Sequence, residues 1–204
     1  GYLIFVSSRS ENFIPRIEKR FDRPFGFVGG NGCFGYCDGE MKWRSYFDSE
    51  DLKSIINYAK VSYYPMLFIL NSRDHPLILA KSGVRKIDAF IYKAYMAFQG
   101  VYREESIFSD QLFFSSIAKG EAYKLMIFVG YTRKRKLLAK KLAEEVNAKY
   151  DSVEAHWLNE FVEITPKGCT KADGLSKLLD YLGMNSDNIV VVGDGGNDVP
   201  MFER

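Results

Sequence analysis

The residues best suited to chemistry lie near the C-terminal end, in the run Gly193-Asp-Gly-Gly-Asn-Asp198. Its three glycines let the backbone curl, so the carboxylates of Asp194 and Asp198 can converge on one point. Mg²⁺ prefers such oxygen ligands, together with phosphate oxygens and water. The alternative is a turn whose side chains cap backbone amides. Because the run follows an apolar segment, residues 189–192, and ligands bind beyond the carboxyl ends of parallel strands, we predict a magnesium site at both aspartates.

A lysine stands where a helix is predicted to begin. Residues 172–182 carry leucines at helical spacing, and Gly183 is a typical C-terminal stop. Thr170-Lys-Ala-Asp173 fits a capping box. Backbone N–H groups and the helix dipole favour an anion at such a terminus, so Lys171 is predicted to add a charge for a phosphate or for crowded carboxylates. Taken alone, a lysine there is more often an ordinary surface residue.

Two hydroxyls follow the first predicted strand. The apolar run Tyr2-Leu-Ile-Phe-Val6 is typical of a buried parallel strand, and Ser7 and Ser8 come directly after it. Hydroxyls and amides at a strand-to-helix turn can bind phosphate oxygens. The alternative is that one serine caps a helix. The lysine and the acidic run together favour the phosphate-binding interpretation.

The elements that must position these residues predict an α/β fold. A capped helix, a short loop and the strand-like residues 189–192 form a unit that feeds a parallel sheet. Residues 34–163 show alternating, half-buried patterns instead, with a hairpin signal at Asp38-Gly39. We therefore predict a doubly wound, parallel-sheet core of residues 1–33 and 164–204, interrupted by an α+β insert of residues 34–163, with the site at their boundary.

Within the insert, helical patterns cover residues 51–60 and 133–149. Strand patterns cover residues 63–70 and 124–129, and one or two more strands are predicted over residues 151–164. Residues 87–99 fit no single pattern.

Composition excludes several classes of protein. The 204 residues carry 28 Lys+Arg and 26 Asp+Glu, and 47% are hydrophobic, which is ordinary for a globular protein and excludes a disordered one. No apolar stretch approaches the ~20 residues of a membrane helix, and no secretory signal opens the chain. Three cysteines, an odd number, favour free thiols in a reducing compartment, so we expect a cytoplasmic protein.

Only two histidines are present, His75 and His156, and neither lies near a cysteine in the sequence. A zinc site needs about four soft ligands at close spacing, so this composition disfavours zinc. A Ser-His-Asp or Cys-His hydrolase needs a histidine as its base, so these classes are disfavoured too.

Taken together, the motifs resemble the phosphatases of the haloacid dehalogenase superfamily, in particular the Cof type, whose Rossmann-like core carries a large inserted α/β cap. In that family a serine or threonine ends the second strand, as Ser7 does here, and a lysine opens a later helix, as Lys171 does. The runs Glu163-Ile-Thr-Pro-Lys-Gly-Cys-Thr-Lys171 and Val190-Val-Val-Gly-Asp-Gly-Gly-Asn-Asp-Val-Pro-Met201 are similar to the Cof pattern almost residue for residue, and Asn31-Gly32 matches it too.

The resemblance implies Mg²⁺-dependent hydrolysis of a small phosphate monoester, such as a sugar phosphate or a cofactor-like phosphate, through an aspartyl-phosphate. It implies that Asp194 and Asp198 hold the metal, directly or through water, and that Lys171 and Asp194 are catalytic. The residues implied to bind the substrate or its phosphate are Ser7, Ser8, Asn31, Lys171 and Asn197, the last of which also orients the loop.

The family's Asp-x-Asp motif has no counterpart in the chain. Its first aspartate attacks phosphorus, and its second acts as general acid and base. The resemblance places this motif on a strand between residues 2–6 and 189–192, and removing that strand would expose an edge on both neighbours. We therefore expect a nucleophile upstream of Gly1. The alternative is a non-catalytic protein that binds phosphate ligands.

Two further patterns suggest other functions. Gly30-Asn-Gly-Cys-Phe-Gly35 matches a dinucleotide-binding fingerprint, but a turn-like Tyr36-Cys-Asp-Gly39 follows where the fingerprint needs a helix, so an NAD-binding module is a third alternative. Residues 132–149 carry seven basic side chains against two acidic ones. We expect them to form a solvated helix face and predict no nucleic-acid or membrane partner. The sequence leaves the oligomeric state open.

Overall fold

The computed structural model describes residues 1–75, 78–80, 107–194 and 198–203. The chain divides into two compact units. Residues 1–45 and 168–204 form one, which we call the core unit, and residues 46–167 form the other, the cap unit. These boundaries lie at 45/46 and 167/168, whereas the sequence placed them at 33/34 and 163/164.

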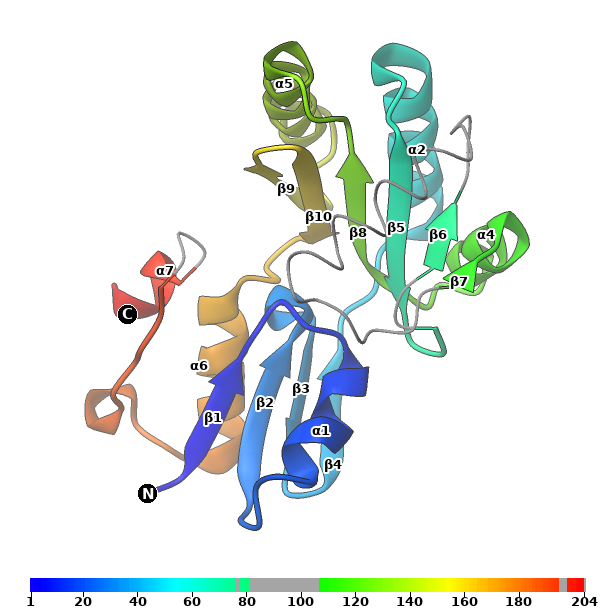
Figure 1. Ribbon diagram of the computed structural model, residues 1–204. Helices are drawn as coiled ribbons and strands as arrows, with labels where there is room; N and C mark the ends of the chain where they lie inside the picture. Colours follow the sequence, from blue (N-terminus) through cyan, green and yellow to red (C-terminus); the bar gives the residue numbers. More distant parts are fainter. Residues whose placement is uncertain (76–77, 81–106, 195–197, 204) are drawn as a thin grey trace. The chain divides into compact units, whose positions relative to one another are not determined.

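The core unit contains a four-stranded sheet in the order β1-β2-β3-β4 (Figure 1). β1 (Leu3–Val6) and β2 (Phe25–Gly29) are parallel, whereas β3 (Phe34–Cys37) and β4 (Glu40–Arg44) form an antiparallel hairpin. Asp38 and Gly39 turn this hairpin with φ values of 52° and 83°, as predicted for such a dipeptide. Because β3 pairs with β2, the hairpin belongs to the core sheet and not to the insert.

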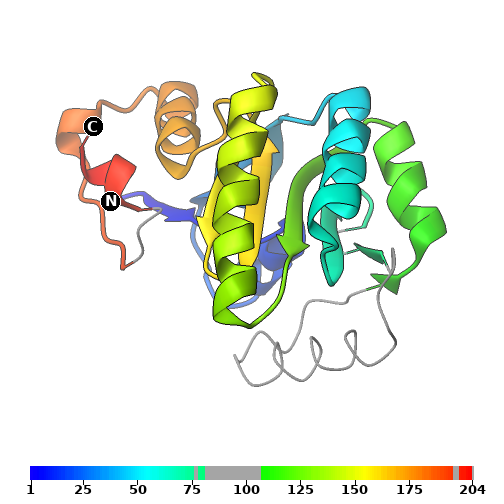
Figure 2. The ribbon, with the colours of Figure 1, turned by 90° about the horizontal axis from the view of Figure 1, so that it is seen from above.

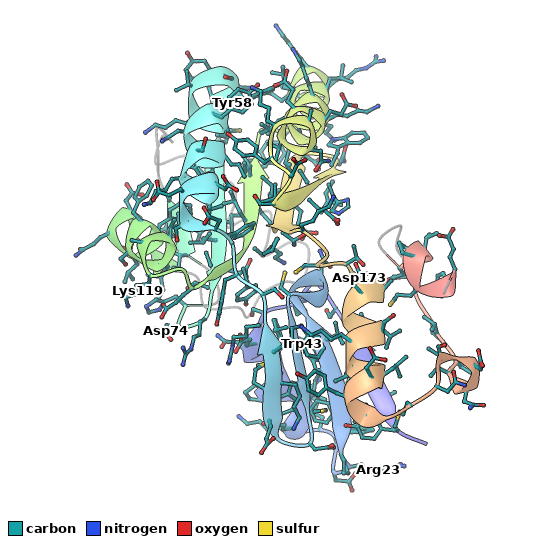
Figure 3. The ribbon with its side chains drawn as sticks, turned by 180° about the vertical axis from the view of Figure 1, so that it is seen from behind. Arg23, Trp43, Tyr58, Asp74, Lys119 and Asp173 are labelled. Atoms are coloured by element: carbon teal, nitrogen blue, oxygen red, sulfur yellow. The ribbon has the colours of Figure 1, made fainter. Side chains whose placement is uncertain are left out.

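Helices cover both faces of the core sheet (Figure 1). On one face, Phe13, which precedes α1 (Ile14–Glu18), packs its ring 6.4 Å from that of Phe27. On the other, Leu178 of α6 (Lys171–Leu182) packs into a cluster with residues of β2, β3 and β4. Trp43 lies beside α6 and stacks on Tyr181, with ring centroids 5.8 Å apart (Figure 3). This arrangement confirms the predicted α/β class.

The strand predicted over residues 189–192 is not part of either sheet, and this corrects the sequence analysis. The segment follows a short 3₁₀ turn, Ser186–Asn188, and precedes α7 (Val199–Phe202). Ile189 and Val191 pack against α6, while Val190 and Val192 are 92% and 88% exposed. Such alternation is that of an extended segment, but no described strand lies beside it to form a ladder.

The cap unit contains a six-stranded sheet in the order β7-β6-β5-β8-β10-β9. Three helices lie side by side on one face of it (Figure 2). The strands are β5 (Leu67–Ser72), β6 (Ile78–Ala80), β7 (Ile107–Phe108), β8 (Ala122–Phe128), β9 (Val153–Leu158) and β10 (Phe161–Pro166), and the helices are α2 (Ser49–Tyr63), α4 (Asp110–Ala118) and α5 (Arg133–Lys149).

Most predicted elements of the insert are present, and α5 has the predicted bounds. The strand predicted over residues 63–70 begins later, at Leu67, because α2 continues to Tyr63. Residues 87–99 lie outside the described part of the chain. None of the described helices combines the length and the apolar character that crossing a bilayer requires.

Several basic side chains of α5 are used in contacts within the cap unit. Lys136 forms an ion pair with Glu160 at 2.9 Å, and Arg135 donates to the carbonyl of Tyr63 at 2.8 Å. Tyr58 of α2 (labelled in Figure 3) and Tyr63 both donate to Glu145 of α5, and these hydrogen bonds lower the pKa of that carboxyl. These contacts support the interpretation of α5 as a structural helix.

A side chain forms hydrogen bonds with the backbone at the edge of the cap sheet. Among the described strands β9 is the outermost on its side of the sheet, and an unpaired strand edge can pair with another chain. Asn147 of α5 donates its Nδ2 to the carbonyl of Ala155 and accepts the Ala155 N–H at Oδ1, both at 2.8 Å. The carboxamide thus pairs with the outer edge of β9 as a neighbouring strand would, next to the exposed Trp157 and Leu158.

We predict that Asn147→Ala lowers the free energy of unfolding by about 1–3 kcal/mol, because it leaves two backbone groups without partners. Light scattering after gel filtration is expected to show larger species than in the wild type, because the edge of β9 becomes available. Ser115→Ala, which removes one hydroxyl-to-carbonyl bond within α4, is the control and should leave the mass unchanged. An unchanged urea midpoint and mass for Asn147→Ala would contradict the prediction.

Candidate functional site

The turns after β1 and β2 are joined by backbone hydrogen bonds. Ser7 donates its N–H to the carbonyl of Val28 at 2.8 Å, and Asn31 donates to the carbonyl of Ser7 at 3.2 Å. Ser7 Oγ accepts the N–H of Arg9 at 3.2 Å, so its own O–H proton is not used in that bond. Ser7, Ser8 and Asn31 therefore lie together beyond the carboxyl ends of two parallel strands, where ligands of α/β sheets bind.

The turn that carries Asn31 packs directly on the start of α6. Asn31 has a left-handed backbone (φ 60°, ψ 38°), and it is buried. Gly32 has a φ of 98°, and a Cβ added there would lie 2.1 Å from the carbonyl oxygen of Thr170. Only glycine permits this approach. β3 begins at Phe34, so a strand and not a helix follows the glycines, and the dinucleotide fingerprint lacks the helix that it needs.

Thr170 caps the start of α6, as predicted, and Asp173, labelled in Figure 3, lies in the first turn of that helix. Thr170 Oγ1 accepts the N–H of Asp173 at 3.1 Å and donates to Asp173 Oδ2 at 2.5 Å. Gly183 ends the helix with a left-handed backbone (φ 62°), as predicted. The cap fixes the first helical residue as Lys171, which is therefore held next to the Asn31 turn.

Lys171 and Asp198 form a buried ion pair. Lys171 Nζ lies 2.5 Å from Asp198 Oδ1, and the two side chains are 10% and 7% exposed. Asp198 Oδ2 accepts the backbone N–H of Asp194 at 3.1 Å. Both carboxylate oxygens of Asp198 are thus used in charge-assisted or backbone hydrogen bonds. The ion pair connects the start of α6 to the acidic run.

Asp194 is exposed, in contrast to Asp198. A Cβ on Gly193 would lie 2.6–2.8 Å from the side chain of Asp198, so glycine is required there for the run to close on that carboxylate. Among the described residues, no three His, Cys, Asp or Glu side chains form a metal-binding group. Mg²⁺ often uses only one or two carboxylates and keeps several waters, so an exposed Asp194 beside Asp198 fits this ion. Asn197 lies outside the described residues.

An apolar groove of about 590 Å³ runs between β1 and residues 189–192. Among the described strands, β1 pairs only with β2, so its other edge faces this groove. Ile4 and Val6 pack on the same α6 cluster as Ile189 and Val191, which places the two segments on one face of that helix. Both segments lead directly into candidate site residues, β1 into Ser7 and residues 189–192 into Gly193.

The structure thus brings together most of the residues singled out from the sequence. Ser7, Asn31 and Lys171 meet where the β1 and β2 turns contact α6. Asp198 joins them through Lys171, and Asp194 through Asp198. A role for Lys171 beside crowded carboxylates was expected from the sequence, but Asp198 was not predicted as its partner. The lysine and the aspartate lie 27 residues apart, and only the tertiary fold brings them into contact.

Comparisons with known proteins agree with this fold. YkrA of Bacillus subtilis (strain 168), which is named as a phosphatase, is 22% identical over 209 residues that span 100% of this chain and 70% of YkrA. The solved structure of TM0651 from Thermotoga maritima matches with a TM-score of 0.74 at 23% identity, over 99% of this chain and 70% of that one. A subclass IIB sugar phosphatase of the superfamily, BT4131, matches with a TM-score of 0.70 at 17% identity, over 97% and 69% of the two chains.

At these identities the solved structures show a shared fold, a core with a cap. The family is shown by the sequence itself, because the sequence model of the haloacid dehalogenase-like hydrolases matches residues 1–204. The chain therefore belongs to the haloacid dehalogenase-like hydrolases, as its motifs indicated.

Proposed function

We propose that the full-length protein is a Mg²⁺-dependent phosphatase that hydrolyses a small phosphate monoester through an aspartyl-phosphate. The observation that carries this proposal is the buried Lys171–Asp198 ion pair beside the ends of two parallel strands. The phosphatase name of YkrA and the sugar-phosphatase title of BT4131 support the same substrate class. A sugar phosphate or a cofactor-like phosphate is the proposed substrate.

The phosphoryl group gains charge and needs donors and cations around its oxygens during transfer. Ser7 and Ser8 would donate their hydroxyl protons to these oxygens, with Asn31 beside them. Lys171 would supply a positive charge at the start of α6, where the helix dipole already favours an anion. Asn197 would orient the loop.

Mg²⁺, when bound, supplies further charge neutralisation at the phosphoryl group. Asp194 would hold it through its exposed carboxylate. Asp198 would contribute through water, because its two oxygens already accept hydrogen bonds from Lys171 and from the Asp194 backbone. In this arrangement Asp198 would fix the positions of Lys171 and of the loop through these two hydrogen bonds, and Asp194 would bind the ion.

We further propose that the nucleophilic aspartate lies upstream of Gly1, on a strand that fills the groove. The free edge of β1, the exposed Val190 and Val192, and the apolar lining of the groove all support an additional central strand. Its carboxyl end would lie between Ser7 and Gly193. There the carboxylate would attack phosphorus and displace the alcohol, which takes a proton from the second aspartate of the motif, and water would then hydrolyse the acyl phosphate.

The role of Asp194 is tested by Asp194→Asn in the full-length protein, assayed on p-nitrophenyl phosphate across a range of Mg²⁺ concentrations. We predict that kcat/KM falls about 100-fold or more and that the response to Mg²⁺ weakens, because the amide is a poorer ligand. Asp180→Asn, the same change on an exposed residue of α6, should leave both unchanged. Full activity in Asp194→Asn would contradict the metal role, and no turnover by a wild type that still binds phosphate would favour the non-catalytic alternative.

The ion pair is tested by comparing Lys171→Met with the double variant Lys171→Met/Asp198→Asn. The single variant leaves a buried carboxylate without its cation, so we predict that the free energy of unfolding falls by about 3–5 kcal/mol. We also predict that phosphatase activity is lost. The double variant removes both charges and should regain much of the stability but none of the activity. Thermal unfolding and phosphatase assays measure the two effects. Recovery of activity in the double variant would show that Lys171 acts only structurally.

A further inference from the structure

The last two residues of β4 lie at the same edge of the core sheet as the candidate site. β2 and β3 are antiparallel, and so are β3 and β4, so β4 runs in the same direction as β1 and β2. Its carboxyl end, Trp43 and Arg44, is therefore at the edge where the turns after β1 and β2 lie. Successive side chains of a strand point to opposite faces of the sheet, so Trp43 faces α6 and Arg44 faces away from it.

Trp43, labelled in Figure 3, connects the turn after β2 to α6. Its indole Nε1 donates to the carbonyl of Gly32 at 3.3 Å, and the residue is buried. The ring stacks on Tyr181 with the centroids 5.8 Å apart, and Lys177 Nζ lies 4.8 Å from its centroid. A cation over an aromatic face is attracted to that face. Two side chains of α6 thus hold the indole, and its N–H binds the turn that carries Asn31.

Gly35, the last glycine of the run that matches a dinucleotide fingerprint, makes room for Trp43. The two residues lie opposite each other in the β3–β4 pair, and a Cβ on Gly35 would lie 2.0 Å from the indole ring. Gly174 of α6 makes room for the turn in the same way, because a Cβ there would lie 2.7 Å from Gly32 Cα. This close packing holds the turn against the first residues of α6, where Lys171 lies.

Arg44 connects β4 to the turn after β1. Its guanidinium donates from Nε to Glu11 Oε1 at 2.8 Å and from Nη2 to Glu11 Oε2 at 2.9 Å. Such a bidentate pair fixes the relative orientation of its two partners. Glu11 begins a 3₁₀ turn, Glu11–Phe13, shortly after Ser7 and Ser8. Because β2 and β3 separate β1 from β4 in the sheet, the chain after β1 passes the carboxyl ends of both strands to reach Arg44.

We propose that Trp43 and Arg44 are positioning residues for the phosphate site. The first holds the turn of Asn31 at the start of α6, and the second holds the turn of Ser7 through Glu11. Donors carried by turns have to be kept in place, because a misplacement of about 1 Å can slow a reaction about 100-fold. This inference rests on the proposed function, in which the two turns bind the phosphoryl group, and extends it to side chains that need not touch the phosphate.

The test measures the Kd of full-length protein for inorganic phosphate by calorimetry in the presence of Mg²⁺, and KM and kcat on p-nitrophenyl phosphate. Trp43→Phe keeps an aromatic ring but removes the N–H donor, so we expect Kd and KM to rise about tenfold. A merely structural role would lower kcat, because fewer molecules are folded, and would leave Kd and KM unchanged. Tyr181→Ala is the control. It removes the ring stacked on the same indole, so it should lower the unfolding midpoint without changing Kd or KM.

The role of Arg44 is tested by reversing the ion pair, which also serves if Trp43→Phe folds poorly. Arg44→Glu places two carboxylates together and should raise the Kd for phosphate about tenfold, whereas Arg44→Glu/Glu11→Arg restores opposite charges and should regain most of the affinity. Wild-type Kd and KM in Trp43→Phe, or a double variant no better than Arg44→Glu, would overturn the inference. A wild type that binds phosphate without hydrolysing the ester would overturn the proposed hydrolysis alone, and one that binds no phosphate would overturn both.

Discussion

The ion pair between Lys171 and Asp198 is the interaction on which the candidate site depends. It joins the first residue of a capped helix to a glycine-rich run 27 positions further along the chain. Each partner has a second attachment: Lys171 is fixed by the cap at Thr170, and Asp198 by the N–H of Asp194. A buried pair of this kind is costly to break from one side. The same pair therefore holds the loop in shape and keeps a cation where a phosphoryl group would need one.

A second constraint comes from the core sheet. β1 has one described neighbour, β2, and its other edge faces an apolar groove whose lining includes Val6 and Val192, the residues that directly precede Ser7 and Gly193. Backbone groups along a strand edge need partners, and apolar side chains need cover. Both needs would be met by one more parallel strand, which would also carry its last residues to the point between Ser7 and Gly193. The unpaired edge of β1 and the need for a nucleophile are thus both met by the same proposed strand, which would end between Ser7 and Gly193.

Local signals in the sequence were sufficient for much of the fold. The helix cap at Thr170, the stop at Gly183 and the hairpin at Asp38-Gly39 all depend on neighbouring residues, and all were predicted. Three other features depend on residues far apart in the sequence and were not predicted. They are the pairing of β3 with β2, which puts the hairpin in the core sheet, the absence of a described strand partner for residues 189–192, and the hydrogen bonding of Asn147 to the edge of β9. For the site, residue types and strand ends predicted which residues to examine, but their metal and substrate roles stay predictions.

The most direct test is to locate the phosphorylated residue. Full-length protein is mixed with substrate and Mg²⁺, quenched in acid and reduced with borohydride, which converts an aspartyl-phosphate to homoserine that mass spectrometry can map. We predict a single modified aspartate upstream of Gly1, on the segment that precedes β1, and no modification in a Lys171→Met variant. Two results would contradict this prediction. One is a modified residue within residues 1–204, and the other is phosphatase turnover by a protein that begins at Gly1.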